Sequence, residues 1–252
     1  MIPSFDQQIR SSDCFDALAY QKDRFCWKRL EYLYNQNYIN NTNTTQHIPK
    51  IIHHIWLGGE LPDKYRMYVD SWKKYNPTWE HIFWNDDNTK HIKIKHTENL
   101  GQRSDILRYH ILKQYGGIYV DTDFECLKSF DDLTNLKFFT GIAYPSTIEM
   151  YIGLIASAPE HPIIKSCIDN MGKISWKNPV DIMTTTGNYH FTSCFMSIMA
   201  ASAHEVDGIV AFPMDYFYPF PNTTRDTCVG EERARFIKSW SYAIHHWGVS
   251  WI

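Results

Sequence analysis

The 252-residue chain has a formal net charge of −3, which gives no electrostatic reason to expect a nucleic acid or an anionic membrane as a partner. Its hydrophobic content of 44% is ordinary for a globular protein, and its length suits one large α/β domain with a small helical appendage. Residues 1–30 are too rich in charged side chains for a signal peptide, and no apolar run reaches membrane-spanning length, so we expect a cytoplasmic protein without a membrane span.

A helical pattern occupies the beginning of the chain. Between residues 5 and 36, apolar side chains recur near the helical period at Phe15, Leu18, Phe25, Trp27, Leu30, Leu33 and Tyr34. Residues 35–46 are dense in Asn and Thr, a composition typical of a linker. We therefore predict an N-terminal helical extension with its linker over residues 1–46 and the main domain over residues 47–252.

Strands and helices alternate in the next part of the chain. The predicted strands are residues 50–57, 79–84 and 118–120, and the predicted helices are residues 63–75 and 104–115. Ser104 is the expected N-cap of the second helix, and Gly116 and Gly117 are its expected stop. This β-α-β-α-β order predicts a parallel sheet with helices packed on its faces.

Polar or glycine-rich turns follow all three of these strands. They cover residues 57–59, 85–87 and 121–123. In open α/β sheets, ligands bind beyond the carboxyl ends of the strands, and the three turns would share that edge. The pattern therefore predicts a nucleotide site there.

The last of these turns carries two acids, Asp121 and Asp123. On an extended segment their carboxylates point to the same side, and they repel each other unless a cation joins them. Carboxylate and phosphate oxygens suit Mg²⁺ or Mn²⁺, and a divalent ion assists the departure of a nucleotide diphosphate from a sugar carbon. The alternative is a solvated turn that happens to contain two acids.

The preceding helix adds a second pair of charges. Asp105 and Arg108 are three residues apart and so share a helix face. The planar guanidinium of Arg108 could bridge to a phosphate or a sugar hydroxyl. The alternative is an ion pair that only stabilises the helix.

These motifs together resemble the DXD-containing sugar-binding region of glycosyltransferase family 32. The resemblance rests on Ser-Asp-Ile-Leu-Arg-Tyr at residues 104–109 and on Tyr-Gly-Gly-Ile-Tyr-Val-Asp-Thr-Asp at residues 115–123. Residues 48–56 resemble the family's first strand, and residues 245–251 its His-x-x-x-x-Ser-Trp ending. The family includes yeast initiation-specific α-1,6-mannosyltransferases and capsular glycan transferases. The chain is also similar to the glucosylating domain of the large clostridial toxins.

The resemblance implies a GT-A-type fold, with a Rossmann-like nucleotide-binding region, and roles for single residues. Trp56 matches the Trp that stacks near the nucleotide base, although a core Trp is an equal alternative. Asp105 and Arg108 match contacts to the donor's ribose and sugar. Asp121 matches a further ribose and sugar contact, and Asp123 matches the metal ligand.

The remaining metal ligand is expected near the end of the chain. The alignment puts His245 on the family's His, and the doubled histidine leaves His246 open, although only one of two neighbours on an extended segment can face the metal. Ser250 and Trp251 would cover the diphosphate. Asn188 replaces a family proline and could bind the transferred sugar, the alternative being a polar turn.

The implied function is a retaining glycosyl transfer. A hexose or N-acetylhexosamine would move from a UDP-sugar, preferred over a GDP-sugar, to a glycan, protein or small-molecule hydroxyl, with Mn²⁺ or Mg²⁺ assisting departure of the diphosphate. Two alternatives stay open. One is a metal-dependent sugar-phosphate or phosphodiester hydrolase, and the other is a non-catalytic relative that binds a nucleotide sugar or a glycan.

Two groups of residues are left outside the predicted site. The six cysteines are scattered and form no CxxC pair, so they suggest neither a zinc site nor a disulfide framework, and we expect reduced, mostly buried thiols. His53 and His54 follow each other on an apolar strand and are expected to be core histidines.

Overall fold

The computed structural model describes residues 2–12, 15–144, 147–174, 177–201, 206–225 and 231–248. Its centre is a six-stranded sheet with the strand order β2-β1-β3-β6-β5-β7. A two-stranded ribbon, β4-β8, lies beside it. The strands are β1 (Ile51–Ile55), β2 (Glu80–Trp84), β3 (Gly117–Val120), β4 (Phe124–Cys126), β5 (Phe138–Tyr144), β6 (Glu149–Ser157), β7 (Ile209–Phe212) and β8 (Ala243–His245).

The sheet is mixed, whereas the sequence pattern predicted a parallel one. β1 is parallel to β2 and to β3, as expected, and β5 is parallel to β7. β6, however, is antiparallel to both β3 and β5. The reason lies in the short connection from β5 to β6, because a few residues can join antiparallel strands but a parallel pair needs a crossover of a dozen or more.

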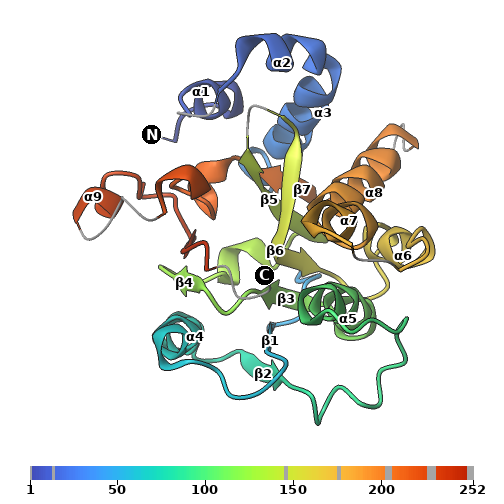
Figure 1. The fold of residues 1–252 in the computed structure, drawn as a ribbon. Coiled ribbons are helices and arrows are strands. Elements are labelled where there is room, and N and C mark those ends of the chain that lie inside the picture. Colours follow the sequence, from blue (N-terminus) through green and yellow to red (C-terminus); the bar gives the residue numbers. More distant parts are fainter. Residues whose placement is uncertain are drawn as a thin grey trace.

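Helices cover the sheet on both sides. They are α4 (Asp63–Tyr75), α5 (Leu100–Tyr115), α6 (Pro162–Asp169), α7 (Pro179–Thr185) and α8 (Asn188–Ala201). Figure 1 shows α5, α6, α7 and α8 together on one side, with α4 and β4 on the other. Shorter elements lie between β4 and β8: the 3₁₀ turns η2 (Asp131–Leu133), η3 (Met214–Tyr216) and η4 (Asn222–Thr224), and the helix α9 (Glu231–Ala234).

The helix α5 begins one turn earlier than predicted. Its N-cap is Asn99, whose side chain accepts a hydrogen bond from the Gln102 N–H, and not Ser104. The Ser104 hydroxyl instead accepts from the Arg108 guanidinium inside the helix. The predicted stop is confirmed at Gly116, which has φ +63° and where an added Cβ atom would lie 2.8 Å from the Ser157 carbonyl oxygen. A side chain there would meet both backbone strain and a clash.

The N-terminal region contains three helices where the pattern predicted one continuous run. They are α1 (Phe5–Arg10), α2 (Ala17–Lys22) and α3 (Arg24–Tyr34), followed by the π-helical turn η1 (Asn35–Ile39). Side-chain caps at Ser4 and Asp16 start the first two. The breaks change the helical phase, so Leu18 and Phe25, which the single-helix pattern placed on the apolar face, are more than 80% exposed.

The same region shares one hydrophobic core with the sheet. Trp27, Leu30 and Leu33 are fully buried in it. Tyr34 packs against Phe212 of β7, with ring centroids 6.1 Å apart. The division at residue 46 stays a prediction, and the core runs across it without interruption.

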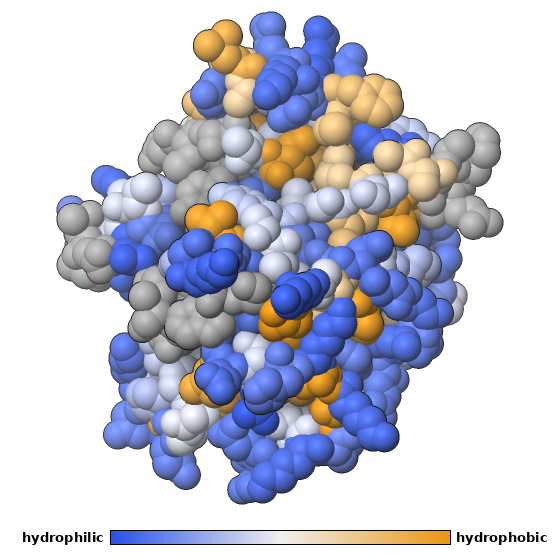
Figure 2. Space-filling view, turned by 45° about the vertical axis from the view of Figure 1, so that its right-hand side comes forward, coloured by the Kyte–Doolittle hydropathy of each residue, from blue (hydrophilic) through white to orange (hydrophobic). Residues whose placement is uncertain are grey.

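The surface shows no broad apolar face in the view of Figure 2, where hydrophilic residues dominate and apolar ones occur in small scattered groups. No helix in the described ranges combines the length and the apolar character that crossing a bilayer requires.

Candidate active site

A cavity of about 440 Å³ opens where β1 and β3 end. It gathers the predicted site residues Trp56, Asp105, Arg108, Asp121, Asp123, Asn188 and His245. These come from the residue after β1, from the turn between β3 and β4, from α5, from the start of α8 and from β8 (Figure 1). The predicted residues Ser250 and Trp251 lie outside the described residues.

The centre of the site is a group of two carboxylates and one imidazole. Ligand atoms of Asp121, Asp123 and His245 all lie within 4.8 Å of one another. The Nε2 atom of His245 is 3.1 Å from Oδ2 of Asp123, which also accepts a 2.6 Å hydrogen bond from the Gly248 N–H. The cause is the ribbon of β4 and β8, which pairs Phe124 with His245 and so brings the end of the described chain against the acidic turn.

His246 faces a different set of partners. Its ring stacks on Tyr68 with centroids 4.1 Å apart. Its Nδ1 lies 2.8 Å from a guanidinium nitrogen of Arg233, and its Nε2 lies 3.0 Å from a carboxylate oxygen of Glu125. Because neighbours on an extended segment point to opposite sides, the structure brings His245, and not His246, to the acidic pair.

Arg108 joins the helix α5 to the acidic turn. Its guanidinium lies 2.9 Å from Oδ1 of Asp105 and 3.3 Å from Oδ1 of Asp121, and it donates a 2.8 Å hydrogen bond to the Ile152 carbonyl. It also lies over the Tyr119 ring, 4.3 Å from the centroid. The Asp105–Arg108 ion pair, which the sequence offered as the alternative to a binding role, is therefore present. It is buried, and Arg108 also reaches Asp121 in the acidic turn.

The three carboxyl groups of the site differ in the direction in which their surroundings shift the pKa. Burial raises the pKa of Asp105 to about 6 although Arg108 opposes the shift. Burial also raises the pKa of Asp121, and the neighbouring Asp123 adds to this effect. Burial alone would raise the pKa of Asp123 as well, but His245 and the Gly248 N–H outweigh it and lower that pKa. A cation at the acidic turn would relieve the remaining repulsion.

Trp56 lines the cavity, and its side chain is partly exposed. Its ring also packs on Tyr65 of a small hydrophobic cluster, with centroids 5.5 Å apart. Both the binding role and the packing role of Trp56 therefore stay predictions. His53 and His54, by contrast, are buried and hydrogen-bond to main-chain carbonyl oxygens, so their predicted core role is confirmed.

Asn188 is the first residue of α8 and also lines the cavity. Its Oδ1 accepts a 3.1 Å hydrogen bond from the Ile152 N–H, and its amide nitrogen lies 3.5 Å from the Glu149 carboxylate. Two residues before it, the Thr186 hydroxyl donates a 3.0 Å hydrogen bond to Asp105. Neither Glu149 nor Thr186 was predicted as a site residue. Only a long-range contact connects Glu149 to the site, whereas Thr186 lies in residues 184–188, which resemble the family's Thr-Gly-Pro segment near the donor and acceptor.

Gly153 is a third residue that was not predicted, although a glycine within a strand is a signal that the sequence contains. It lies in β6 beside the acidic turn, where a Cβ atom would come within 2.9 Å of Oδ2 of Asp121. Glycine inside a strand often marks such a close approach. Its absent side chain leaves the space that the Asp121 carboxylate occupies.

Comparisons with known proteins agree with this geometry. Residues 62–139 match the family described as glycosyltransferase sugar-binding region containing DXD motif. An uncharacterized glycosyltransferase, L373, of Acanthamoeba polyphaga mimivirus is 33% identical over 139 residues, which cover 49% of this chain and 55% of the relative. Inositol phosphoceramide mannosyltransferase 3 of Schizosaccharomyces pombe is 28% identical over 173 residues, covering 65% of this chain and 44% of the relative. The chain thus spans about half the length of these relatives.

Two solved structures show the fold. The catalytic domain of alpha-toxin from Clostridium novyi superimposes with a TM-score of 0.53 and 11% identity, covering 96% of this chain and 85% of the toxin domain. The PaToxG glycosyltransferase superimposes with a TM-score of 0.52 and 20% identity, covering 74% of this chain and 82% of that chain. The fold is therefore of the GT-A type, as the resemblance implied.

Proposed function

We propose that this chain, whose residues 62–139 match the DXD-containing sugar-binding region of glycosyltransferases, transfers a sugar from a nucleotide-diphosphate donor to a hydroxyl acceptor. One observation carries the proposal. The acidic turn, the Arg108 helix and His245 come from distant parts of the sequence and meet at one cavity at the carboxyl ends of parallel strands. That edge is where α/β sheets bind nucleotides, and a cavity of about 440 Å³ is in the range of small-ligand sites.

The donor set fits a divalent metal ion. Carboxylate oxygens and one imidazole nitrogen suit Mn²⁺ or Mg²⁺, with Asp123 and His245 as the protein ligands. The Nδ1 atom of His245 is buried without a hydrogen-bond partner in the described structure, while Nε2 faces Asp123, so the ring is directed at the acidic turn. When bound, the metal would offset the negative charge that develops on the departing diphosphate.

The remaining residues would hold the donor. Trp56 offers a partly exposed aromatic face to the nucleotide base. Asp105 and Asp121 would accept hydrogen bonds from ribose and sugar hydroxyls, and Arg108 keeps both carboxylates in place. Asn188 would contact the transferred sugar from the opposite wall.

We propose transfer with retention of configuration. The bond from the sugar carbon to the phosphate oxygen breaks, the acceptor hydroxyl forms its bond on the same face, and a donor phosphate oxygen takes the acceptor proton. Each acid that lines the described cavity already has partners: Arg108 and Thr186 for Asp105, Arg108 for Asp121, and His245 for Asp123. This pairing supports a route that needs no protein base.

The sugar is proposed to be a hexose or N-acetylhexosamine on a uridine diphosphate, with a guanosine diphosphate as the competing carrier. The names of the Schizosaccharomyces pombe relatives put mannose among the candidate hexoses. The acceptor is proposed to be a sugar or protein hydroxyl. A thermal-shift panel of UDP- and GDP-hexoses, each with and without Mn²⁺, identifies the donor, because a ligand at 100 times its Kd stabilises the fold by about 2.7 kcal/mol.

The Asp123→Ala substitution tests the role of the acidic turn. We expect it to abolish both the Mn²⁺-dependent shift and transfer while the protein stays folded, because it removes the central metal ligand. Asp70→Ala is the matched control, since Asp70 is an exposed acid on α4. Full transfer by Asp123→Ala would overturn the metal assignment. If the protein releases free sugar from the donor and added acceptors receive none of it, the result would instead favour a hydrolase. If the protein binds the donor without turning it over, the result would favour a non-catalytic relative.

A further inference from the structure

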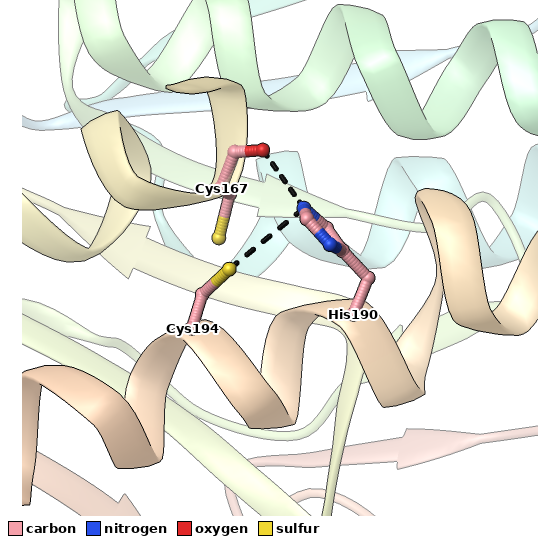
Figure 3. A group of neighbouring side chains, drawn as sticks. All are labelled: Cys167, His190 and Cys194. Atoms are coloured by element: carbon pink, nitrogen blue, oxygen red, sulfur yellow. Dashed lines mark hydrogen bonds between the residues drawn. The ribbon is translucent and has the colours of Figure 1, made fainter. Parts of the chain in front are cut away.

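A second cluster of ligating side chains lies behind the wall of the cavity, between α6 and α8. Cys167 lies near the end of α6, and His190 and Cys194 lie four residues apart on one face of α8. Ligand atoms of the three residues all lie within 4.8 Å of one another. Figure 3 shows the two sulfurs and the imidazole pointing toward one another between the two helices. The Cys194 sulfur is 3.8 Å from Nε2 of His190.

The cluster is closed off from solvent. Cys167, Cys194 and His190 are 0%, 5% and 8% exposed. Two thiols and one imidazole are the soft donors that zinc prefers over oxygen-ligated metals such as Mg²⁺. Both cysteines would bind the metal as thiolates.

A fourth donor is present at the same place. The main-chain carbonyl oxygen of Cys167 lies in the last turn of α6, where carbonyls lack helical partners, and it is 2.8 Å from Nε2 of His190. Without a metal, the imidazole N–H donates to this carbonyl. With a metal, the neutral imidazole would carry its proton on Nδ1 and use the Nε2 lone pair instead.

We propose that Cys167, His190 and Cys194 bind one Zn²⁺ ion through two thiolate sulfurs and the Nε2 nitrogen, with the Cys167 carbonyl oxygen as the fourth ligand. The two thiols release their protons to solvent on binding, the imidazole proton moves from Nε2 to Nδ1, and no redox change occurs. The ion links α6 to α8. Because α8 begins with Asn188 at the cavity, the site stiffens the wall that faces the transferred sugar.

The sequence concealed this site for a geometric reason. The ligands come from two helices, and 23 residues separate Cys167 from His190. Zinc motifs are recognised by closely spaced pairs such as CxxC, whereas here only the His190–Cys194 spacing is local. The expectation that the cysteines form no zinc site is therefore revised by this proposal.

Cobalt binding to the reduced, metal-free full chain tests the site directly, since Co²⁺ replaces Zn²⁺ in tetrahedral sites and shows a thiolate-to-metal absorption band. The Asp123→Asn variant serves as the host protein, so that the acidic turn contributes no strong metal site to the count. We expect one equivalent of Co²⁺ to give the band and one equivalent of Zn²⁺ to abolish it. Absence of the band in the reduced host protein would overturn the proposal.

Matched variants assign the ligands. Cys194→Ser should lose the band, and Cys26→Ser should keep it because Cys26 is a partly exposed thiol outside the cluster. If Cys194→Ser fails to fold, thiol alkylation of the host protein replaces it, and Zn²⁺ must protect Cys167 and Cys194 but not Cys26. A band that survives Cys194→Ser, or a Cys167–Cys194 disulfide that forms in the presence of Zn²⁺, would refute the site.

Discussion

Replacing Arg108 by Ala removes the cation that lies between the buried Asp105 carboxylate and the partly exposed Asp121 carboxylate. The guanidinium is 5% exposed and lies 2.9 Å from Asp105 and 3.3 Å from Asp121. Removing one partner of a buried ion pair costs about 3–5 kcal/mol, because an uncompensated charge stays buried. Arg103→Ala is the matched control on the same helix, since its ion pair with Asp86 is substantially exposed and should contribute no more than about 1 kcal/mol.

The stability lost in the Arg108→Ala variant should be larger at neutral pH than at acidic pH. The folded pKa of Asp105 is about 6, above its ordinary value of 3.8, so the folded state binds the proton more tightly than the unfolded state. Keeping Asp105 ionised at pH 7 therefore already costs on the order of 3 kcal/mol, from about 1.4 kcal/mol per pH unit. Stability from this group is greatest below pH 4 and is lost as the pH rises toward 6.

Without Arg108 that folded pKa rises further, so the cost of Arg108→Ala should be smaller at pH 5 than at pH 7 by about 1 kcal/mol. Urea unfolding of wild type, Arg108→Ala and Arg103→Ala at the two pH values measures both quantities. A further check repeats the measurement with Asp105→Asn added to each protein. The cost of Arg108→Ala should then be nearly the same at pH 5 and pH 7. Equal costs for the two arginine variants, or a larger cost at pH 5, would refute the reasoning.

Four further substitutions test the geometry of the site. Gly153→Ala should lower transfer at least tenfold with a modest loss of stability, because its Cβ would come within 2.9 Å of the Asp121 carboxylate, and kinetics with urea unfolding would separate the two effects. His245→Ala should weaken Mn²⁺ binding in a metal titration while His246→Ala leaves it near wild type, and the reverse order would contradict the placement of the two rings. Trp56→Ala should weaken donor binding by about 1–3 kcal/mol, the range of base stacking on an aromatic ring, and unchanged calorimetric affinity would exclude that contact.

Local patterns were enough to predict the first half of the sheet. Residues 63–75 form the expected helix, and β1, β2 and β3 lie within the expected strands or within one residue of them. Apolar periodicity and glycine stops act over a few residues, so the sequence displays them directly. The same holds for the acidic turn and the Asp105–Arg108 pair, which are set by the end of one strand and by one helix face.

The parts that could not be predicted depend on long-range pairing. The antiparallel insertion of β6 and the pairing of β4 with β8 join segments that carry no mutual signal in the sequence. That second pairing decides between His245 and His246, a choice that alternation alone left open. The division of the N-terminal region into α1, α2 and α3 was likewise not visible in the apolar pattern, which included the exposed Leu18 and Phe25.

The ribbon of β4 and β8 also sets the order in which the site can be completed. Asp121, Asp123 and Arg108 leave the ribosome long before His245, which is docked against them only through the pairing of Phe124 with His245. A nascent chain can therefore form the first strands and the acidic turn while its imidazole ligand is still unsynthesised. In the proposed metal-assisted transfer, the imidazole ligand would therefore join the acidic turn only after the last described strand has docked.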